Sequence, residues 1–194
     1  MATTNPAAPT DVPWDVTRAD FNDWEGRIPY MYVDTRGFVT VGVGYMLPHA
    51  GAAAELPFVW REGGQRATTD EIRTEFDRVH QQPMGKLAQA YKPFTKLDLP
   101  DAAIDALLKT TADRFELGLT QNFAGYRNYP APAKRALLDM AYNLGTDGLL
   151  LYKNLKAAVA RGDWQRAAAE SHRNGPSQER NDWTRDQFLA ALAR

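Results

Sequence analysis

The sequence predicts a globular α+β protein with a small strand-containing part near the N-terminus and a larger helical part after it. Strand-like alternation is confined to one early segment, residues 30–46, and helical periodicity dominates from residue 69 onward. The composition, 44% hydrophobic and 24% charged, is ordinary for a chain that folds around a buried core. The elements are expected in the following order.

Residues 1–13 are rich in Ala, Thr and Pro, which predicts a disordered lead or linker stub. They lack the basic start and apolar run of a secretory signal. No stretch of about 18 apolar residues occurs, so no membrane span is expected. We therefore expect synthesis in the cytoplasm, and a substrate outside it would require another delivery route. Residues 14–194 are expected to form one domain.

A short helix is expected up to Trp24, capped by Asp15 or Thr17. Aromatic and β-branched residues then nearly alternate over residues 30–46. Turn-forming residues 34–37 divide this segment into two runs. The pattern predicts a β-hairpin with an extra edge strand.

Prolines and glycines mark residues 47–68 as loop. A helix is expected from Thr69 to about Gln82, ended by Pro83, and a short helical piece over residues 84–91. A longer helix over about residues 100–122 begins with a proline at a first-turn position. At 1.5 Å per residue it would span roughly 35 Å and connect two lobes, residues 14–99 and 124–194, as a helix over residues 100–123.

Four helical segments follow. The first runs from about Pro132 to Leu144, with Gly145 as its C-terminal cap. The others are expected near residues 152–161, 163–172 and 178–193, and Asp163 is the expected cap of the second of these three.

Composition excludes several kinds of chemistry. The absence of cysteine rules out disulfides, thiol nucleophiles and cysteine zinc sites. His49, His80 and His172 lack ligand spacing, so no metal or cofactor is expected. A formal charge of −1 gives no general attraction to nucleic acid.

Two carboxylates and a threonine stand out in the early segment. Glu25 is expected at a helix C-terminus beside Trp24, where partial negative charge and an apolar neighbour disfavour its ionisation. Asp34 is expected in a polar turn, where it stays ionised. Thr40 can hold a water against Asp34, because a hydroxyl both donates and accepts. A proton donor beside a charged carboxylate is the equipment of glycoside hydrolysis.

Gly42 and Gly44 alternate on the returning strand, where missing side chains would let a sugar approach the backbone. With them the segment resembles the active site of the phage T4-type lysozymes, glycoside hydrolase family 24. The matching residues are Glu25, Gly26, Tyr32, Asp34, Gly37, Thr40, Gly42 and Gly44. The resemblance implies that Glu25 is the general acid, Asp34 the general base and Thr40 the third catalytic residue.

A second segment, residues 135–145, resembles the central helix of the same family, and residues 154–168 continue the match. By this resemblance Met46, Tyr142 and Asn154 fall where the family contacts sugar. Arg180 resembles the family's C-terminal arginine that faces the catalytic glutamate. Tyr32, Tyr45 and Tyr142 are candidate aromatic faces for sugar rings, and Gly44 completes the expected substrate-binding residues.

The resemblance implies a two-lobe lysozyme-like fold with a cleft between the lobes. It implies a muramidase that hydrolyses the β-1,4 bond between N-acetylmuramic acid and N-acetylglucosamine in peptidoglycan, with inversion and without a cofactor. The sequence departs from the family pattern at two places. Tyr45 stands where the family commonly has histidine, and residues 47–99 are long enough to hold a helical insertion.

Other functions remain open. A lytic transglycosylase would use Glu25 alone and need neither Asp34 nor Thr40. A non-catalytic wall-binding module could use the same fold. The segment from Ser171 to Trp183 resembles toxin and effector muramidases, which implies an antibacterial effector acting in the periplasm or outside the producing cell. An endolysin would explain the missing secretory signal equally well, so both roles stay open. For an effector, an immunity protein in the cleft is a candidate partner.

Overall fold

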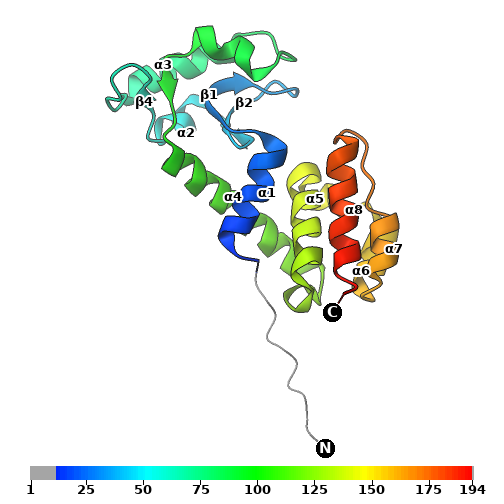
Figure 1. The fold of residues 1–194 in the computed structure, drawn as a ribbon. Helices are drawn as coiled ribbons and strands as arrows, with labels where there is room; N and C mark the ends of the chain where they lie inside the picture. The colour runs from blue at the N-terminus through cyan, green and yellow to red at the C-terminus, as the bar shows by residue number, and fades with distance from the viewer. Residues whose placement is uncertain (1–11, 194) are drawn as a thin grey trace, which may run out of the picture. The chain divides into compact units, whose positions relative to one another are not determined.

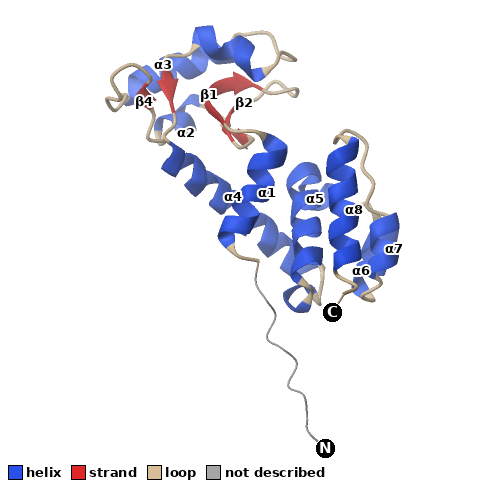
Figure 2. Cartoon of the chain, viewed as in Figure 1, coloured by secondary structure: helices blue, strands red, loops and turns tan. Residues whose placement is uncertain are grey.

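The computed structural model describes residues 12–193 and has the predicted α+β composition, with many helices and two small antiparallel sheets (Figures 1 and 2). The chain divides into two compact units. Within the described residues, one unit is Arg18–Thr111, and the other combines residues 12–17 with residues 112–193. The lead expected over residues 1–13 lies outside the described residues except for its last two. No helix in the described range is long and apolar enough to cross a bilayer.

The first helix, α1, runs from Trp14 to Glu25. The predicted caps were wrong, because Asp15 lies in the first turn and Thr17 is buried inside the helix. The negative charge of Asp15 in the first turn still interacts favourably with the helix dipole. The helix ends at Gly26, whose φ of +71° reverses the chain toward the first strand.

The predicted hairpin with an extra edge strand is confirmed. Strands β1 (Ile28–Val33), β2 (Val39–Gly42) and β3 (Tyr45–Met46) form an antiparallel sheet in the order β1-β2-β3. Tyr32 pairs with Thr40, which pairs in turn with Met46. Because directly paired residues share a face of the sheet, these three side chains lie on one face.

The region after the sheet contains more structure than predicted. The expected loop holds helix α2 (Ala50–Ala54) and strand β4 (Val59–Trp60), and β4 pairs with strand β5 (Leu97–Asp98). Strands of two residues carry no periodic signal, so their pairing depends on tertiary context. The expected helical piece over residues 84–91 was placed too early, since a 3₁₀ helix, η1, covers Ala88–Phe94.

Helix α3 (Thr69–His80) begins as predicted, with a capping box formed by Thr68 and Glu71. On its buried face, Glu75 accepts hydrogen bonds from the backbone N–H groups of Lys96 at 2.6 Å and Leu97 at 3.2 Å. These bonds attach β5 to α3. They also satisfy a carboxylate that is only 3% exposed.

The long helix α4 (Asp101–Asn122) confirms the predicted helix over residues 100–122. Arg27 binds two carboxylates in the first turns of α4. Its Nε donates to Asp101 Oδ1 and its Nη1 donates to Asp105 Oδ1, each at 2.9 Å. Arg18 Nε adds a third bond, to Asp105 at 2.9 Å. This cluster joins α1, through Arg18, and the turn after α1, through Arg27, to the start of α4.

The Arg18–Arg27–Asp105 cluster predicts an acid-dependent loss of stability. Burial would raise the pKa of Asp105, but the hydrogen bonds from Arg18 and Arg27 outweigh it and lower the pKa. The stabilisation is therefore complete above the pKa of an unfolded aspartate, about 4, and is lost as pH falls through the lower folded pKa. Denaturant unfolding across this range should show a shallower acid dependence for Asp105→Asn than for wild type. The same change at exposed Asp77 should leave the dependence unaltered.

The second unit is helical. Helix α5 (Ala131–Leu150) is interrupted at Gly145, whose φ of 74° confirms the predicted helix end there. Helices α6 (Lys153–Ala160), α7 (Trp164–Ala169) and α8 (Gln178–Ala190) follow, and a short 3₁₀ helix, η2 (Tyr126–Asn128), precedes α5. Asp163 caps α7 as predicted, accepting from the N–H of Arg166 at 3.0 Å.

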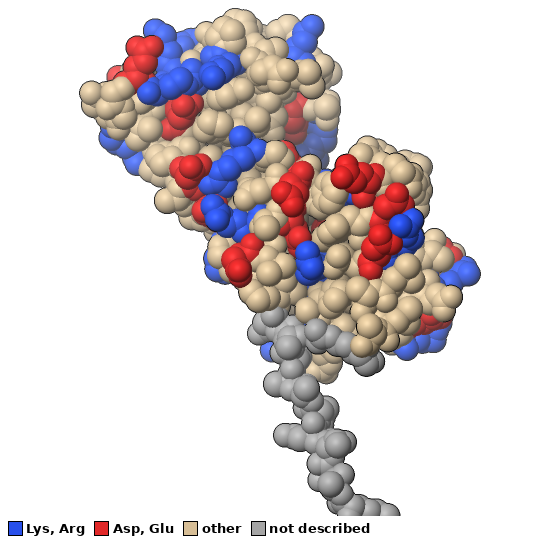
Figure 3. Space-filling view, viewed as in Figure 1, with Lys and Arg blue, Asp and Glu red and all other residues tan. Residues whose placement is uncertain are grey.

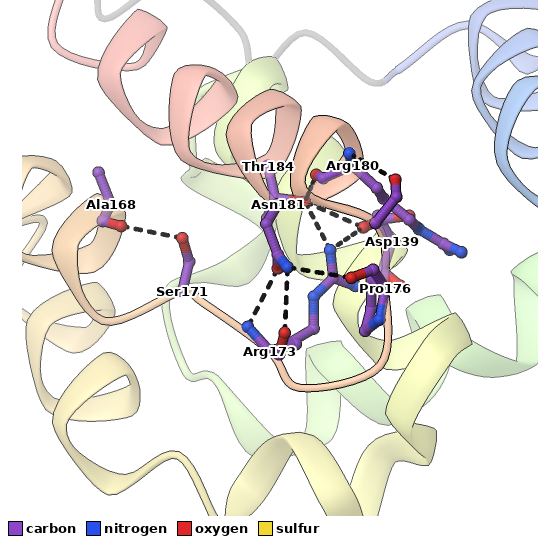
Figure 4. A network of polar contacts seen from close by, with 9 residues as sticks. Asp139, Ala168, Ser171, Arg173, Pro176, Arg180, Asn181 and Thr184 are labelled. Carbon is purple, nitrogen blue, oxygen red and sulfur yellow. Dashed lines mark hydrogen bonds and ion pairs between the residues drawn. The ribbon is translucent and has the colours of Figure 1, made fainter.

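A buried ion network joins α5 to α8 (Figure 4). Asp139 Oδ2 binds Arg173 Nη2 at 2.7 Å, while Asp139 Oδ1 binds Arg180 Nε at 2.9 Å and Nη2 at 2.8 Å. The Thr184 hydroxyl accepts from Arg173 Nη2 at 2.7 Å, and Asn181 bonds both backbone groups of Arg173 at 3.0 Å. Burial lowers the pKa of Arg173, although Asp139 opposes the shift.

The network predicts a large effect of removing its single carboxylate. Asp139→Asn should lower the free energy of unfolding by about 3–5 kcal/mol, because two buried guanidinium groups lose their shared counter-charge. Equilibrium denaturation measures the loss. Asp147→Asn, an exposed change on the same helix, should cost less than about 0.5 kcal/mol. Similar small losses for both variants would contradict the role assigned to Asp139.

Candidate active site

The candidate site begins with Glu25, the last residue of α1. Its side chain is half-buried, and the chain turns sharply at Gly26 directly after it. Arg27, two residues on, is fixed by Asp101 and Asp105. The position of Glu25 therefore depends on the contact between this turn and α4.

Asp34 builds the turn that follows β1. Its Oδ1 accepts hydrogen bonds from the backbone N–H groups of Arg36 at 2.8 Å and Phe38 at 2.9 Å. Its Oδ2 lies 3.6 Å from Arg36 Nε, and the side chain is 19% exposed. A carboxylate that accepts N–H groups of the following residues is typical of an Asx-type turn. Asp34 thus has a structural role in the hairpin, and its second oxygen remains at the surface.

Thr40 lies on β2 directly opposite Tyr32 and is only 2% exposed. Its hydroxyl donates to the carbonyl of Phe38 at 3.2 Å. Phe38 also donates its backbone N–H to Asp34 Oδ1, so Thr40 and Asp34 are connected through the backbone of Phe38. The donated proton leaves the lone pairs of the Thr40 hydroxyl available as acceptors.

Tyr32 shows that the two carboxylates lie near one another. Burial, and after it the negative charges of Glu25 and then Asp34, raise the pKa of the Tyr32 phenol to about 12. Both carboxylates are therefore within electrostatic range of one phenol, although they come from different elements. Three of the residues expected at the catalytic site and the substrate site, Glu25, Tyr32 and Asp34, are brought together within Arg18–Thr111.

The neighbouring positions divide between the two faces of the sheet. Met46, 40% exposed, lies on the face of Tyr32 and Thr40. Tyr45 pairs with buried Val41, so its side chain lies on the opposite face from Thr40. The structure therefore separates Tyr45 from the other tyrosine expected on this hairpin.

The two glycines have different surroundings. A Cβ on Gly42 would lie 3.1 Å from Ile104 of α4, and φ there is +69°. Close packing against α4, not an approach by sugar, explains this glycine. Gly44 is exposed in the turn between β2 and β3, and its φ of +68° lies in the left-handed region.

Three expected residues belong to the helical unit. Tyr142 on α5 is half-buried, and its ring lies 5.6 Å from that of Phe115. Asn154 is exposed near the start of α6, donates to Glu170 Oε2 at 3.3 Å, and lines a shallow pocket of about 250 Å³. Arg180 is buried and binds Asp139 through two of its nitrogens.

Sequence reasoning missed several residues that support these positions. Arg27 is only two residues after Glu25, but its partners Asp101 and Asp105 lie more than seventy residues away. Arg173 and Asp139 were likewise missed as a pair. Asp139, in the apolar helical run of residues 136–141, is a weak signal for a buried cationic partner, because unpaired buried charges are costly.

The arrangement around Tyr32 can support proton transfer. It offers a half-buried glutamate, an aspartate held by backbone N–H groups, and a hydroxyl attached to the same turn. General acid–base catalysis needs two such groups in different environments. In the part of the chain that the structure describes, no group of three or more His, Asp or Glu side chains is placed to hold a metal ion.

The chain was compared with known families and with curated proteins. No family model matches the sequence, and no curated protein is significantly similar to it.

The Tyr32 titration offers a test of the site geometry that needs no substrate. Glu25→Gln and Asp34→Asn should each lower the Tyr32 pKa below about 12, because each removes a negative charge that opposes phenolate formation. Burial should keep it above the usual value of about 10. The phenolate absorbance of each protein is read as a difference from its Tyr32→Phe counterpart, since the chain has eight tyrosines.

Asp23→Asn, at an exposed position on α1, is the matched control and should leave the Tyr32 titration unchanged. Circular dichroism at each pH confirms that the protein is still folded. If neither carboxylate variant moves the Tyr32 pKa more than Asp23→Asn does, the two acids do not share a site.

Proposed function

We propose that the protein is a muramidase that hydrolyses the β-1,4 bond between N-acetylmuramic acid and N-acetylglucosamine in bacterial peptidoglycan. One observation carries the proposal. Besides burial, the charges of Glu25 and Asp34, the two carboxylates of the sequence pattern, both raise the pKa of the Tyr32 phenol. Glycoside hydrolysis needs such a pair on either side of one glycosidic oxygen.

The local surroundings support a division of roles. Glu25 is half-buried at the C-terminus of α1, and it is the proposed general acid. Asp34 Oδ1 accepts two backbone N–H groups, whereas Oδ2 accepts none and has only Arg36 Nε nearby, at 3.6 Å, so Oδ2 is the oxygen proposed to take a proton from water as general base. Thr40, whose hydroxyl is oriented by Phe38, would position that water.

The proposal extends to architecture and substrate contacts through the family resemblance. It includes the two-lobe lysozyme fold, inversion at the anomeric carbon and a supporting role for Arg180 near Glu25. Tyr32 and Met46 share a face with Thr40 and are the sugar contacts on the hairpin that the register supports. Tyr142 and Asn154 are the proposed contacts from the helical unit. The enzyme would act outside the cytoplasm of its producer, as an endolysin or an effector.

The decisive experiment is mass spectrometry of a purified peptidoglycan digest. Wild type should release hydrolysed muropeptides, and Glu25→Gln should reduce the rate by about 10²–10⁴-fold, the usual loss when a general acid is removed. Asp34→Asn should cause a similar loss. Asp23→Asn, which changes an exposed carboxylate two residues before Glu25, should keep the wild-type rate.

The product mass separates muramidase from transglycosylase. A transglycosylase product lacks one water, and its formation would not require Asp34 or Thr40. Anhydro products that persist in Asp34→Asn would overturn the hydrolytic proposal in favour of transglycosylation. Absence of any product from wild type, with binding to the intact wall retained, would favour a non-catalytic wall-binding module.

A further inference from the structure

A pocket of about 260 Å³ lies apart from the candidate active site, between α3, β4 and β5. We call it the α3–β5 pocket. Its lining residues are Trp60, Asp70, Glu71, Thr74, Glu75, Arg78, Lys96 and Leu97. In Figure 3 acidic and basic side chains lie side by side over this part of the molecule.

The pocket is held in shape from beneath. Glu75 is buried and accepts the N–H groups of Lys96 and Leu97, which fixes β5 against α3. Trp60 pairs with Leu97 across the β4–β5 ladder. All three walls are therefore joined, α3 to β5 by side-chain bonds and β4 to β5 by the backbone ladder.

The acids of the pocket already have donors. Glu75 takes two backbone N–H groups, as described above. Glu71 Oε2 accepts the N–H of Thr68 at 2.8 Å and its hydroxyl at 2.9 Å, and these bonds, with one from Trp60, lower the pKa of Glu71. Asp70, at the exposed rim, lies 3.5 Å from Arg73.

Unlike the acids, the two cations of the pocket, Arg78 and Lys96, lack close partners of opposite charge in the described chain. Within the described chain, neither Arg78 nor Lys96 lies within ion-pair distance of a carboxylate. Arg78 Nη1 makes one long bond, to the carbonyl of Phe94 at 3.3 Å, and Lys96 is exposed. The charge of Arg78 opposes the burial that raises the pKa of Glu75, but the two side chains form no hydrogen bond or ion pair. N–H donors of both cations are therefore available here while the acceptors are occupied, which favours an anionic ligand.

The remaining walls are apolar. Trp60 is half-buried and Leu97 is 1% exposed, so an aromatic face and an aliphatic floor lie beside the two cations. The volume is below the roughly 300–1,000 Å³ of pockets that take drug-sized ligands. A small apolar group that carries one carboxylate fits this combination.

We propose that the α3–β5 pocket binds the terminal carboxylate of a peptide through Arg78 and Lys96, with the side chain of the terminal residue packed on Trp60. A carboxylate suits two donors that approach from neighbouring elements. The identity of the peptide rests on the proposed function: peptidoglycan carries short peptides with free carboxyl ends. The segment between the hairpin and α4 would then recognise the peptide part of the substrate.

The first test uses a matched pair of probes, N-acetyl-D-alanyl-D-alanine and its C-terminal amide, which differ in the carboxylate charge. Binding is followed through the indole N–H resonance of Trp60, assigned by comparison with Trp60→Phe because the chain has five tryptophans. The acid should bind with a dissociation constant of about 1 mM, the scale expected for a ligand of this size. The amide should bind at least tenfold more weakly.

Variants identify the donors. Lys96→Gln and Arg78→Gln should each weaken binding of the acid at least tenfold, because each removes a charge-assisted hydrogen bond. Arg73→Gln on the same helix and Lys86→Gln are the controls, since both residues are exposed and outside the pocket lining. Equal binding of acid and amide, no saturable shift of the Trp60 resonance, or equal losses in variants and controls would each overturn the proposal.

Failure of this proposal is distinguishable from failure of the proposed function. Glu25→Gln should bind the peptide like wild type, and Lys96→Gln should cleave peptide-free glycan strands like wild type. Lys96→Gln should cleave intact peptidoglycan more slowly at low substrate concentration. If the protein binds the peptide but cleaves no glycan, the proposed muramidase function is wrong and the proposed peptide site stands. If Lys96→Gln cleaves both substrates at unchanged rates, only the proposed peptide site is wrong.

Discussion

The geometry of the candidate site depends on how the Asp34 carboxylate closes the first hairpin. Its two backbone hydrogen bonds, to the N–H groups of Arg36 and Phe38, fix where β2 begins. That start sets the register in which Tyr32 faces Thr40. A shift by one residue would move Thr40 and Met46 to the other face of the sheet. The same side chain is therefore a turn residue and the proposed base, and the two roles use different oxygens.

The second constraint is electrostatic. Burial, followed by the negative charges of Glu25 and Asp34, raises the pKa of the Tyr32 phenol to about 12. Arg27, bound to Asp101 and Asp105, holds the turn after Glu25 in place. The site thus relies on ion pairs that themselves take no part in the proposed chemistry.

The helical unit uses buried charge for a different purpose. Asp139 joins two arginines from the C-terminal region, and Thr184 completes the contact. Because Arg180 is one of the two, a residue expected beside the catalytic acid also belongs to the packing of α5 against α8. The segment with the least regular structure, residues 47–99, instead uses a buried carboxylate, Glu75, to join α3 to β5 and so creates the α3–β5 pocket.

The sequence alone determined the elements whose signals are local. The hairpin, the long helix, the start of α3 at Thr69, the Asp163 cap and the helix end at Gly145 were all predicted, since periodicity and cap chemistry act within a few residues. Tertiary structure decided what joins distant parts: the β4–β5 pairing, the face on which Tyr45 lies, the packing that requires Gly42, and the partners of Arg27 and Arg173. These contacts link residues far apart in the chain, and their stabilisation comes from burial and charge pairing that appear only when the chain has folded.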